Sequence, residues 1–186
     1  MKFLLDTNVL SEIRKPNGHA GVKAFIGSLR EDDLFISVIS IGEINFGIEK
    51  LPPGAKKTEL LYWLMQKLPE RFGKRIITLD AAVMAEWGKL QAGTEKTLPV
   101  CDSRRGVHTP PFKALKKGMY PESITLREQH TPSLQGGVVD SLIAASALVH
   151  RLALVTRNTK DFERITDLHL VNPWDDTRYI HKKKRI

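Results

Sequence analysis

Short apolar runs alternate with amphipathic stretches along most of the chain. The apolar runs are four to six residues long, as is typical of buried strands, and they lie at residues 2–5, 34–39, 75–79, 153–156 and 168–171. Apolar residues recur at helical spacing elsewhere, at residues 22–29, 41–51, 58–68, 80–91 and 141–150, and also around Val9, Leu10 and Ile13. Strands that alternate with helices predict an α/β fold with a central parallel sheet.

A parallel sheet also predicts where a ligand site would lie. Helices cover both faces of such a sheet, and ligands bind beyond the carboxyl ends of its strands. Asp6 directly follows the first predicted strand, and Thr156 ends a later one. We therefore expect functional residues at Asp6 and in the segment after Thr156.

The stretch 94–137 interrupts the alternation. It contains four glycines, several prolines and no clear apolar period. A loop of this length inside a compact domain is uncommon, and it is usually functional or disordered. The rest of the chain has the length of one domain, so we predict a single domain over residues 1–186 that is interrupted here.

The composition excludes several classes of protein. A hydrophobic fraction of 41% is ordinary for a globular domain. No segment reaches the roughly 18 uninterrupted apolar residues of a membrane helix, and the opening MKFLLD meets a charge too early for a signal peptide. The single cysteine, Cys101, excludes an intramolecular disulfide and a cysteine-rich zinc site. We expect a soluble cytoplasmic protein without a membrane partner.

The net charge of +8 favours a polyanionic partner, above all nucleic acid. The excess is uneven, because residues 101–137 carry six Lys and Arg against three Asp and Glu. The C-terminal tail at 176–186 adds the basic ending RYIHKKKRI. This tail is either a solvated, frayed terminus or a contact with RNA, and the sequence leaves both open.

Four acidic residues stand near the ends of predicted elements. Asp6 ends the first strand, and Glu43 lies in about the first turn of the helix after the second strand. Asp140 begins the late helix of small residues, and Asp161 follows the strand at 153–156. A carboxylate near a core is costly unless it is paired or binds a metal. A hard divalent cation such as Mg²⁺ or Mn²⁺, which prefers oxygen ligands, would offset the repulsion within such a group.

Each acid also has a simpler interpretation. Asp6 and Asp140, taken singly, are most often helix caps. Glu43 alone would more often be a surface residue, and Asp161 in TRNTKDF fits a turn closed by side-chain hydrogen bonds. The four together favour a metal site, although their spacing alone leaves both interpretations open.

Four segments resemble the PIN-domain ribonucleases, in particular the VapC and FitB toxins of bacterial toxin–antitoxin pairs. They are LLDTNVLSEIRKP, SVISIGEINFGIEKLPPG, DSLIAASALVHRLALVTRNTKDF and NPWD, and the likeness covers nearly the whole chain except about 94–138. The resemblance implies a PIN-like α/β fold with three α/β/α layers and a central parallel sheet of four to five strands.

The same resemblance implies a metal site. The acidic cluster that holds Mg²⁺ or Mn²⁺ would consist of Asp6, Glu43, Asp140 and Asp161. The residues that help to order this cluster or its waters would be Asn8 and Thr156, with Arg157 and Asn158 nearby. Asn8 is alternatively only a helix cap.

The implied activity is that of a metal-dependent endoribonuclease toxin. A cation held by Asp6 and Asp140 would lower the pKa of a bound water and offset charge in the transition state. Glu43 would hold a metal water or a second ion, and Asp161 would orient the attacking water or complete the metal shell. In-line attack would yield a 5′-phosphate and a 3′-hydroxyl, with single-stranded or looped RNA as the expected substrate.

The resemblance further implies two protein partners. One is a second copy of the chain, in a homodimer. The other is a cognate antitoxin of the VapB or FitA type, a small DNA-binding protein whose tail would cross the acidic cleft. A basic side chain of that tail would neutralise the carboxylates.

Residues 101–137 depart from the family's pattern. The family usually runs from a Leu-Pro segment directly into the helix of the third acid, and removing about 101–137 would join LPV to VVDSLIAASAL. We predict an inserted loop there, next to the active site, with Asp140 rather than Asp102 as the ligand. An insertion at this place allows an alternative, a catalytically impaired PIN-fold protein that still binds RNA or an antitoxin. A nuclease that acts on DNA, or in RNA processing without toxicity, is a third interpretation.

Overall fold

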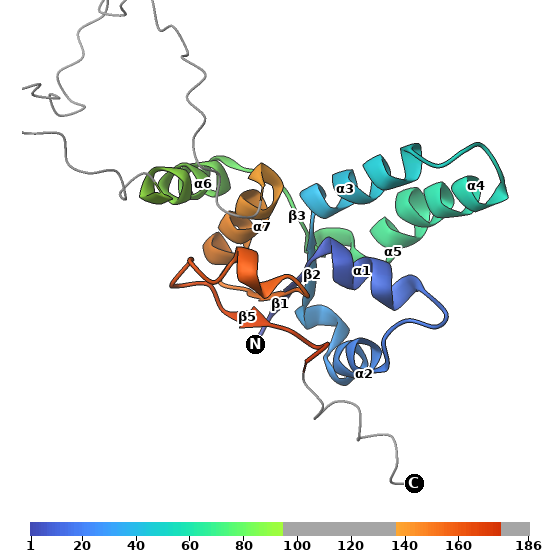
Figure 1. Ribbon diagram of the computed structural model, residues 1–186, viewed down its shortest axis with the longest axis horizontal. Coiled ribbons are helices and arrows are strands. Elements are labelled where there is room, and N and C mark those ends of the chain that lie inside the picture. Colours follow the sequence, from blue (N-terminus) through green and yellow to red (C-terminus); the bar gives the residue numbers. More distant parts are fainter. Residues whose placement is uncertain (95–136, 176–186) are drawn as a thin grey trace, which may run out of the picture.

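The computed structural model describes residues 1–94 and 137–175, which Figure 1 shows in colour. Within them five strands form one parallel sheet in the order β3-β2-β1-β4-β5. The strands are β1 (Phe3–Leu5), β2 (Leu34–Ser37), β3 (Ile76–Ile77), β4 (Ala153–Val155) and β5 (Leu170–Val171). Each lies within two residues of its predicted bounds. The predicted parallel sheet of four to five strands is therefore confirmed.

Helices cover both faces of the sheet and complete three α/β/α layers (Figure 1). One face carries α1 (Thr7–Arg14), α2 (Ala20–Ser28), α3 (Val38–Glu49), α4 (Ala55–Tyr62) and α5 (Leu68–Phe72). The other carries α7 (Val138–Val149), with α6 (Ala81–Thr94) packed beside it. Tight turns η1 (Glu31–Asp33), η3 (Gly73–Arg75) and η6 (Thr159–Asp161) and the π-helical turn η2 (Trp63–Lys67) link these elements.

The central strand β1 divides the hydrophobic core into two parts. Successive side chains of a strand point to opposite faces, so Phe3 and Leu5 pack under α1 and α2 whereas Leu4 packs under α7. All three are buried. Helix α7 approaches its face closely because it presents the small side chains Ala144 and Ala147. The apolar run that predicted this strand is thus explained by burial on both faces.

The start of α3 corrects one prediction. The β-branched run at 34–39 predicted a six-residue strand with Ser40 as the cap of a helix at 41–51. In the structure the strand ends at Ser37, whose hydroxyl accepts the N–H of Ile39 at 3.2 Å and caps the helix three residues earlier. An N-cap hydroxyl at Ser37 outweighs the strand preference of Val38 and Ile39, which is a weak and context-dependent term.

Two predicted segments fall largely outside the described residues. They are the inserted loop at about 101–137, of which only Gly137 is described, and the basic tail at 176–186. In the parts of the chain that are described, no helix has the length and apolar character needed to cross a membrane.

Candidate functional site

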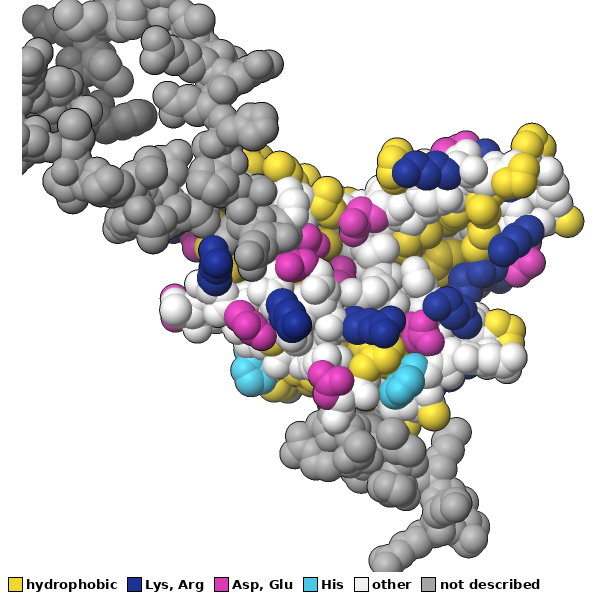
Figure 2. Space-filling view, viewed as in Figure 1, with side chains coloured by type: hydrophobic (Ala, Val, Ile, Leu, Met, Phe, Trp, Pro, Cys, Tyr) yellow, Lys and Arg dark blue, Asp and Glu magenta, His cyan; other side chains and the backbone are white. Residues whose placement is uncertain are grey.

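The predicted acidic residues lie where the strands of the sheet end. Asp6 follows β1, and Glu43 lies in the second turn of α3, the helix that follows β2. Asp140 lies in the first turn of α7, and Asp161 ends the turn after β4. Figure 2 shows Asp and Glu side chains gathered near the middle of one face of the molecule. The fold therefore places the four predicted acids at one edge of the sheet.

Asp6 is the most firmly fixed of the four. The residue is only 5% exposed. One carboxylate oxygen accepts the backbone N–H of Thr7 at 2.7 Å, and the other accepts the Asn8 amide at 2.5 Å and the Thr156 hydroxyl at 2.6 Å. Asp6 is thus also the N-cap residue of α1. The capping and site interpretations are compatible, because the cap hydrogen bond also orients the carboxylate.

The predicted supporting residues form one hydrogen-bonded network around Asp6. The Thr156 hydroxyl accepts the Asn8 amide at 3.1 Å and the backbone N–H of Asn158 at 3.0 Å. The backbone N–H of Arg157 donates to the Asn8 side-chain oxygen at 3.2 Å. The Asn158 amide in turn donates to a carboxylate oxygen of Asp161. The network joins the end of β1 to the loop after β4. The alternative that Asn8 is only a helix cap is wrong, because Asp6 is the N-cap of α1 and the Asn8 side chain bonds Asp6, Thr156 and the backbone of Arg157.

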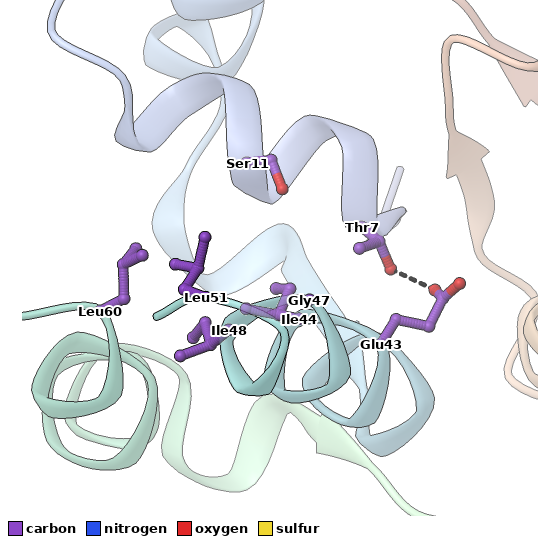
Figure 3. Close-up of a pocket in the computed structure, with 8 residues that line it drawn as sticks. All are labelled: Thr7, Ser11, Glu43, Ile44, Gly47, Ile48, Leu51 and Leu60. Atoms are coloured by element: carbon purple, nitrogen blue, oxygen red, sulfur yellow. Dashed lines mark hydrogen bonds between the residues drawn. The ribbon is translucent and has the colours of Figure 1, made fainter. Parts of the chain in front are cut away.

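Glu43 is held by a residue that the sequence did not indicate. The Thr7 hydroxyl of α1 donates to the Glu43 carboxylate at 2.5 Å, across the gap between α1 and α3 (Figure 3). Thr7 could be recognised in the sequence only as a capping candidate, because no local pattern shows which hydroxyl reaches a helix 36 residues away. Thr7 therefore joins the candidate site as the residue that orients Glu43.

A groove opens beside Glu43 between α1, α3 and α4. Its volume is about 260 Å³, and most of its lining is apolar (Figure 3). The lining residues are Thr7, Ser11, Glu43, Ile44, Gly47, Ile48, Leu51 and Leu60. Thr7 and Glu43 thus connect this groove to the acidic edge of the sheet.

Asp140 shows that the acids share one electrostatic environment. Burial, together with the negative charges of Asp6, Asp161 and Glu43, raises the pKa of its carboxyl to about 6. The backbone N–H of Gly137, the N-cap residue of α7, donates to the Asp140 carboxylate and opposes the shift. Asp140 is therefore not the cap itself but an acid in the first turn that bonds back to the cap residue.

The pKa values of Asp6, which is buried, and of Glu43, which is partly buried, shift in the same direction. Burial raises the pKa of Asp6, although its hydrogen bonds from Thr156, Thr7 and Asn8 oppose the change. Burial also raises the pKa of Glu43, the charge of Asp6 adds to the increase, and the Thr7 hydrogen bond opposes it. Perturbed carboxyl groups gathered in one place are a feature of functional sites.

The chemistry of this cluster suits a hard divalent cation. Its donor atoms are carboxylate oxygens, and a cation would relieve the repulsion that raises the pKa of Asp140. Across residues 1–94 and 137–175, however, no three acidic, histidine or cysteine side chains lie in an arrangement that could hold a metal ion. The residues fit Mg²⁺ or Mn²⁺ in type and charge, and binding would require their side chains to turn toward one another.

Comparisons with known proteins extend over nearly the whole chain. No family model matches it. Toxin FitB of Neisseria gonorrhoeae is 28% identical over 174 residues, which are 94% of this chain and 99% of FitB. VapC ribonuclease Y4jK of Sinorhizobium fredii is 24% identical, with 93% and 98% covered. The crystal structure of FitAcB from Neisseria gonorrhoeae superposes with a TM-score of 0.68 at 26% identity, over 94% of this chain and 99% of that one.

Proposed function

From the confirmed resemblance to the FitB and VapC type of PIN-domain toxin, we propose that this protein is a metal-dependent endoribonuclease toxin that a cognate antitoxin neutralises. The observation that carries the proposal is the placement of four acids at one edge of the sheet, close enough for the charges of the other three to help raise the pKa of Asp140. These acids lie far apart in the sequence, and a structural role alone would not require four of them together.

The residues of the site have different proposed roles. Asp6 and Asp140 would hold Mg²⁺ or Mn²⁺, which supplies an activated water and offsets charge on the phosphate. The protein itself keeps the carboxylates in place, because Thr156 and Asn8 orient Asp6 while Thr7 orients Glu43.

Asp161 completes this arrangement from the turn after β4. The amide of Asn158 donates a hydrogen bond to its carboxylate, and the charge of Asp161 helps to raise the pKa of Asp140. We propose that Asp161 orients the attacking water or completes the ion's shell. In-line attack by this water would leave a 5′-phosphate and a 3′-hydroxyl. Single-stranded or looped RNA is the proposed substrate form, because proteins that select RNA sequences mostly bind unpaired segments.

We also propose the two partners that the resemblance implies. A homodimer is one, and a VapB- or FitA-type antitoxin is the other, with its tail crossing the acidic edge near Glu43. A basic side chain of the antitoxin would replace the cation as the charge that neutralises the carboxylates, and so the toxin would be held inactive.

An RNA cleavage assay tests the proposal. Purified protein is incubated with total RNA and Mn²⁺ beside three variants, Asp6→Asn, Asp140→Asn and Asp32→Asn. Asp32 is an exposed acid that precedes β2, at the opposite edge of the sheet from the cluster, and serves as the matched control. We expect cleavage by the wild type and the control, a loss of about a hundredfold or more in the two site variants, and no cleavage in EDTA.

The possible outcomes separate the alternatives. Equal cleavage by the wild type and both site variants would refute the assigned mechanism. If none of the proteins cleaves but the wild type binds RNA or an antitoxin, the protein is the catalytically impaired form instead. Cleavage of DNA with RNA left intact would support the third interpretation.

A further inference from the structure

Arg157 is an exposed cation that stands beside the acidic cluster without joining it. Its backbone N–H donates to Asn8, whose amide donates to Asp6, so the residue lies two hydrogen bonds from the most buried carboxylate of the site. Its guanidinium nevertheless forms no ion pair with any carboxylate in the described part of the chain. Figure 2 shows Lys and Arg side chains in a row just below the clustered carboxylates on the same face.

The guanidinium lies over an aromatic ring instead. The Arg157 guanidinium carbon is 5.9 Å from the centre of the Trp174 ring. A cation in this position is attracted by the ring and loses little of its hydration, and Arg suits the position because its planar group can stack while its N–H donors stay available. The stack therefore fixes where the charge sits without using up its hydrogen-bonding capacity.

Trp174 is itself held firmly. Its backbone N–H donates to the Asn172 side chain at 3.0 Å, and its ring packs against the main hydrophobic core. The ring of His19 lies 6.3 Å away, centre to centre, at 33°. Gly21 lets the segment approach α2, because a Cβ there would lie only 2.9 Å from the Pro173 carbonyl oxygen. The tryptophan is thus packed against its neighbours, while Arg157 is exposed to solvent.

Four carboxylates at this edge would repel an RNA backbone unless cationic groups offset them. We propose that Arg157, held in place by Trp174, binds a backbone phosphate of the RNA next to the one that is cleaved. The proposal rests on the proposed function. A planar guanidinium can give a phosphate two parallel hydrogen bonds, and a side chain that is already immobilised loses less entropy on binding. Contacts of this kind set the position of the strand rather than its sequence preference.

The alternative is that Arg157 and Trp174 only fasten the C-terminal segment to the sheet. The two roles predict different measurements. A phosphate contact contributes to RNA affinity and to its dependence on salt, whereas a fastening contact contributes to the free energy of unfolding. Both quantities can be measured on the full chain without a metal ion.

The test is a binding titration of a fluorescein-labelled single-stranded RNA by fluorescence anisotropy, in EDTA and at several salt concentrations. The variants are Arg157→Ala, Arg157→Lys, Trp174→Leu and Trp174→Phe. The control is Arg30→Ala, since Arg30 precedes β2 at the opposite edge of the sheet. Thermal unfolding of each variant and its kcat and KM for RNA cleavage in Mn²⁺ are measured alongside.

We expect Arg157→Ala to raise the Kd for RNA about tenfold and to lower the slope of log Kd against log salt by about 0.7, the value for one phosphate contact on a single strand. The KM should rise with kcat little changed, because a remote phosphate is bound alike in the ground and transition states. The Kd values of Arg157→Lys and Trp174→Leu for RNA should lie between those of the wild type and Arg157→Ala. The Kd values of Trp174→Phe, which keeps an aromatic ring, and of Arg30→Ala should stay near that of the wild type.

Other outcomes overturn the proposal. If Arg157→Ala binds RNA like Arg30→Ala while the wild type still cleaves, Arg157 is not a phosphate contact and the proposed function stands. A lower melting temperature with unchanged RNA affinity would assign the pair a fastening role. If the wild type neither binds nor cleaves RNA, the phosphate contact and the ribonuclease function fail together.

Discussion

Asp140 shows, at the scale of one residue, that a cluster of carboxylates destabilises the folded protein when no cation is bound. Its pKa is raised from the ordinary value to about 6, so the folded protein binds a proton at Asp140 more tightly than the unfolded chain does. Lowering the pH through 6 therefore favours the folded state, and raising it charges a carboxyl that faces three others. The raised pKa values of Asp6 and Glu43 act in the same direction.

We predict that the metal-free protein is more stable at pH 5 than at pH 7.5. Asp140→Asn, which cannot ionise, should raise the melting temperature at pH 7.5 by a few degrees and reduce the difference between the two pH values. Mn²⁺ should stabilise the wild type at pH 7.5 and should have much less effect on the variant. Thermal unfolding, followed by circular dichroism at both pH values, measures the melting temperatures of the wild type and the variant. One series contains EDTA and the other contains excess Mn²⁺.

Glu12 and Glu31 do not affect the comparison of stability between pH 5 and pH 7.5. Their hydrogen bonds to Lys15 and Arg71 lower the pKa of each, so both stay charged at pH 5. A wild type that is less stable at pH 5 than at pH 7.5, with Asp140→Asn parallel to it, would contradict the electrostatic account.

The sequence indicated the four acids but not how they are held. The four acids, Asp6, Glu43, Asp140 and Asp161, could be chosen because each stands near the end of a predicted element and because the surrounding motifs resemble a known family. The Thr7 hydroxyl that bonds Glu43, and the ring of Trp174 beneath Arg157, depend on the angle between elements distant in the chain. Such contacts are decided by packing, which no local spacing encodes.

Among the elements, the strands were easier to predict than the helices that follow them. A strand of a parallel sheet is buried on both faces, so its apolar run is continuous and short. The helix predicted at 58–68 is in fact α4, a π-helical turn and α5, and it continues past Pro69 to Phe72. The wider turn keeps Leu64 and Leu68 buried, so the apolar period was correct while the helix type was not.

The contact between α6 and α7 includes one buried hydroxyl that bonds residues of both helices. The Trp87 indole N–H donates to the Ser141 hydroxyl at 2.9 Å, and the Gln91 amide donates to the same oxygen at 3.2 Å. The Ser141 hydroxyl donates to the Val138 carbonyl at 2.8 Å and thereby closes the first turn of α7. This turn carries Asp140, so the contact between the two helices also positions an acid of the site.

We predict that Ser141→Ala lowers the free energy of unfolding by about 1–3 kcal/mol, because it leaves the partly buried Trp87 N–H without this acceptor. Ser146→Ala is the matched control. Ser146 is equally buried, but its hydroxyl bonds only to the Leu142 carbonyl of its own helix, so we expect a change under about 1 kcal/mol. Urea unfolding measures both, and equal losses would show that the link to α6 contributes nothing.

At the scale of the whole molecule, the contact between α6 and α7 sets the length of chain that is needed to join the two helices. Gln91 touches Ser141, so the end of α6 at Thr94 and the start of α7 at Val138 each lie about one helical turn from a shared contact. A chain of six residues spans up to about 20 Å when extended. Residues 95–100 are therefore long enough to join the two helices directly, as the sequence pattern also suggested for a domain without residues 101–137.

We predict that a variant lacking residues 101–136 folds to the same sheet, melts within a few degrees of the full chain and still cleaves RNA in Mn²⁺. The reason is that both core clusters and the hydrogen bonds around Asp6 are built from residues 1–94 and 137–175. Replacing the same residues by a six-residue Gly-Ser linker is the control for strain at the junction, since added loop length costs little. If both shortened chains unfold, residues 101–136 belong to the fold; if both fold and lose only cleavage, they belong to the active site.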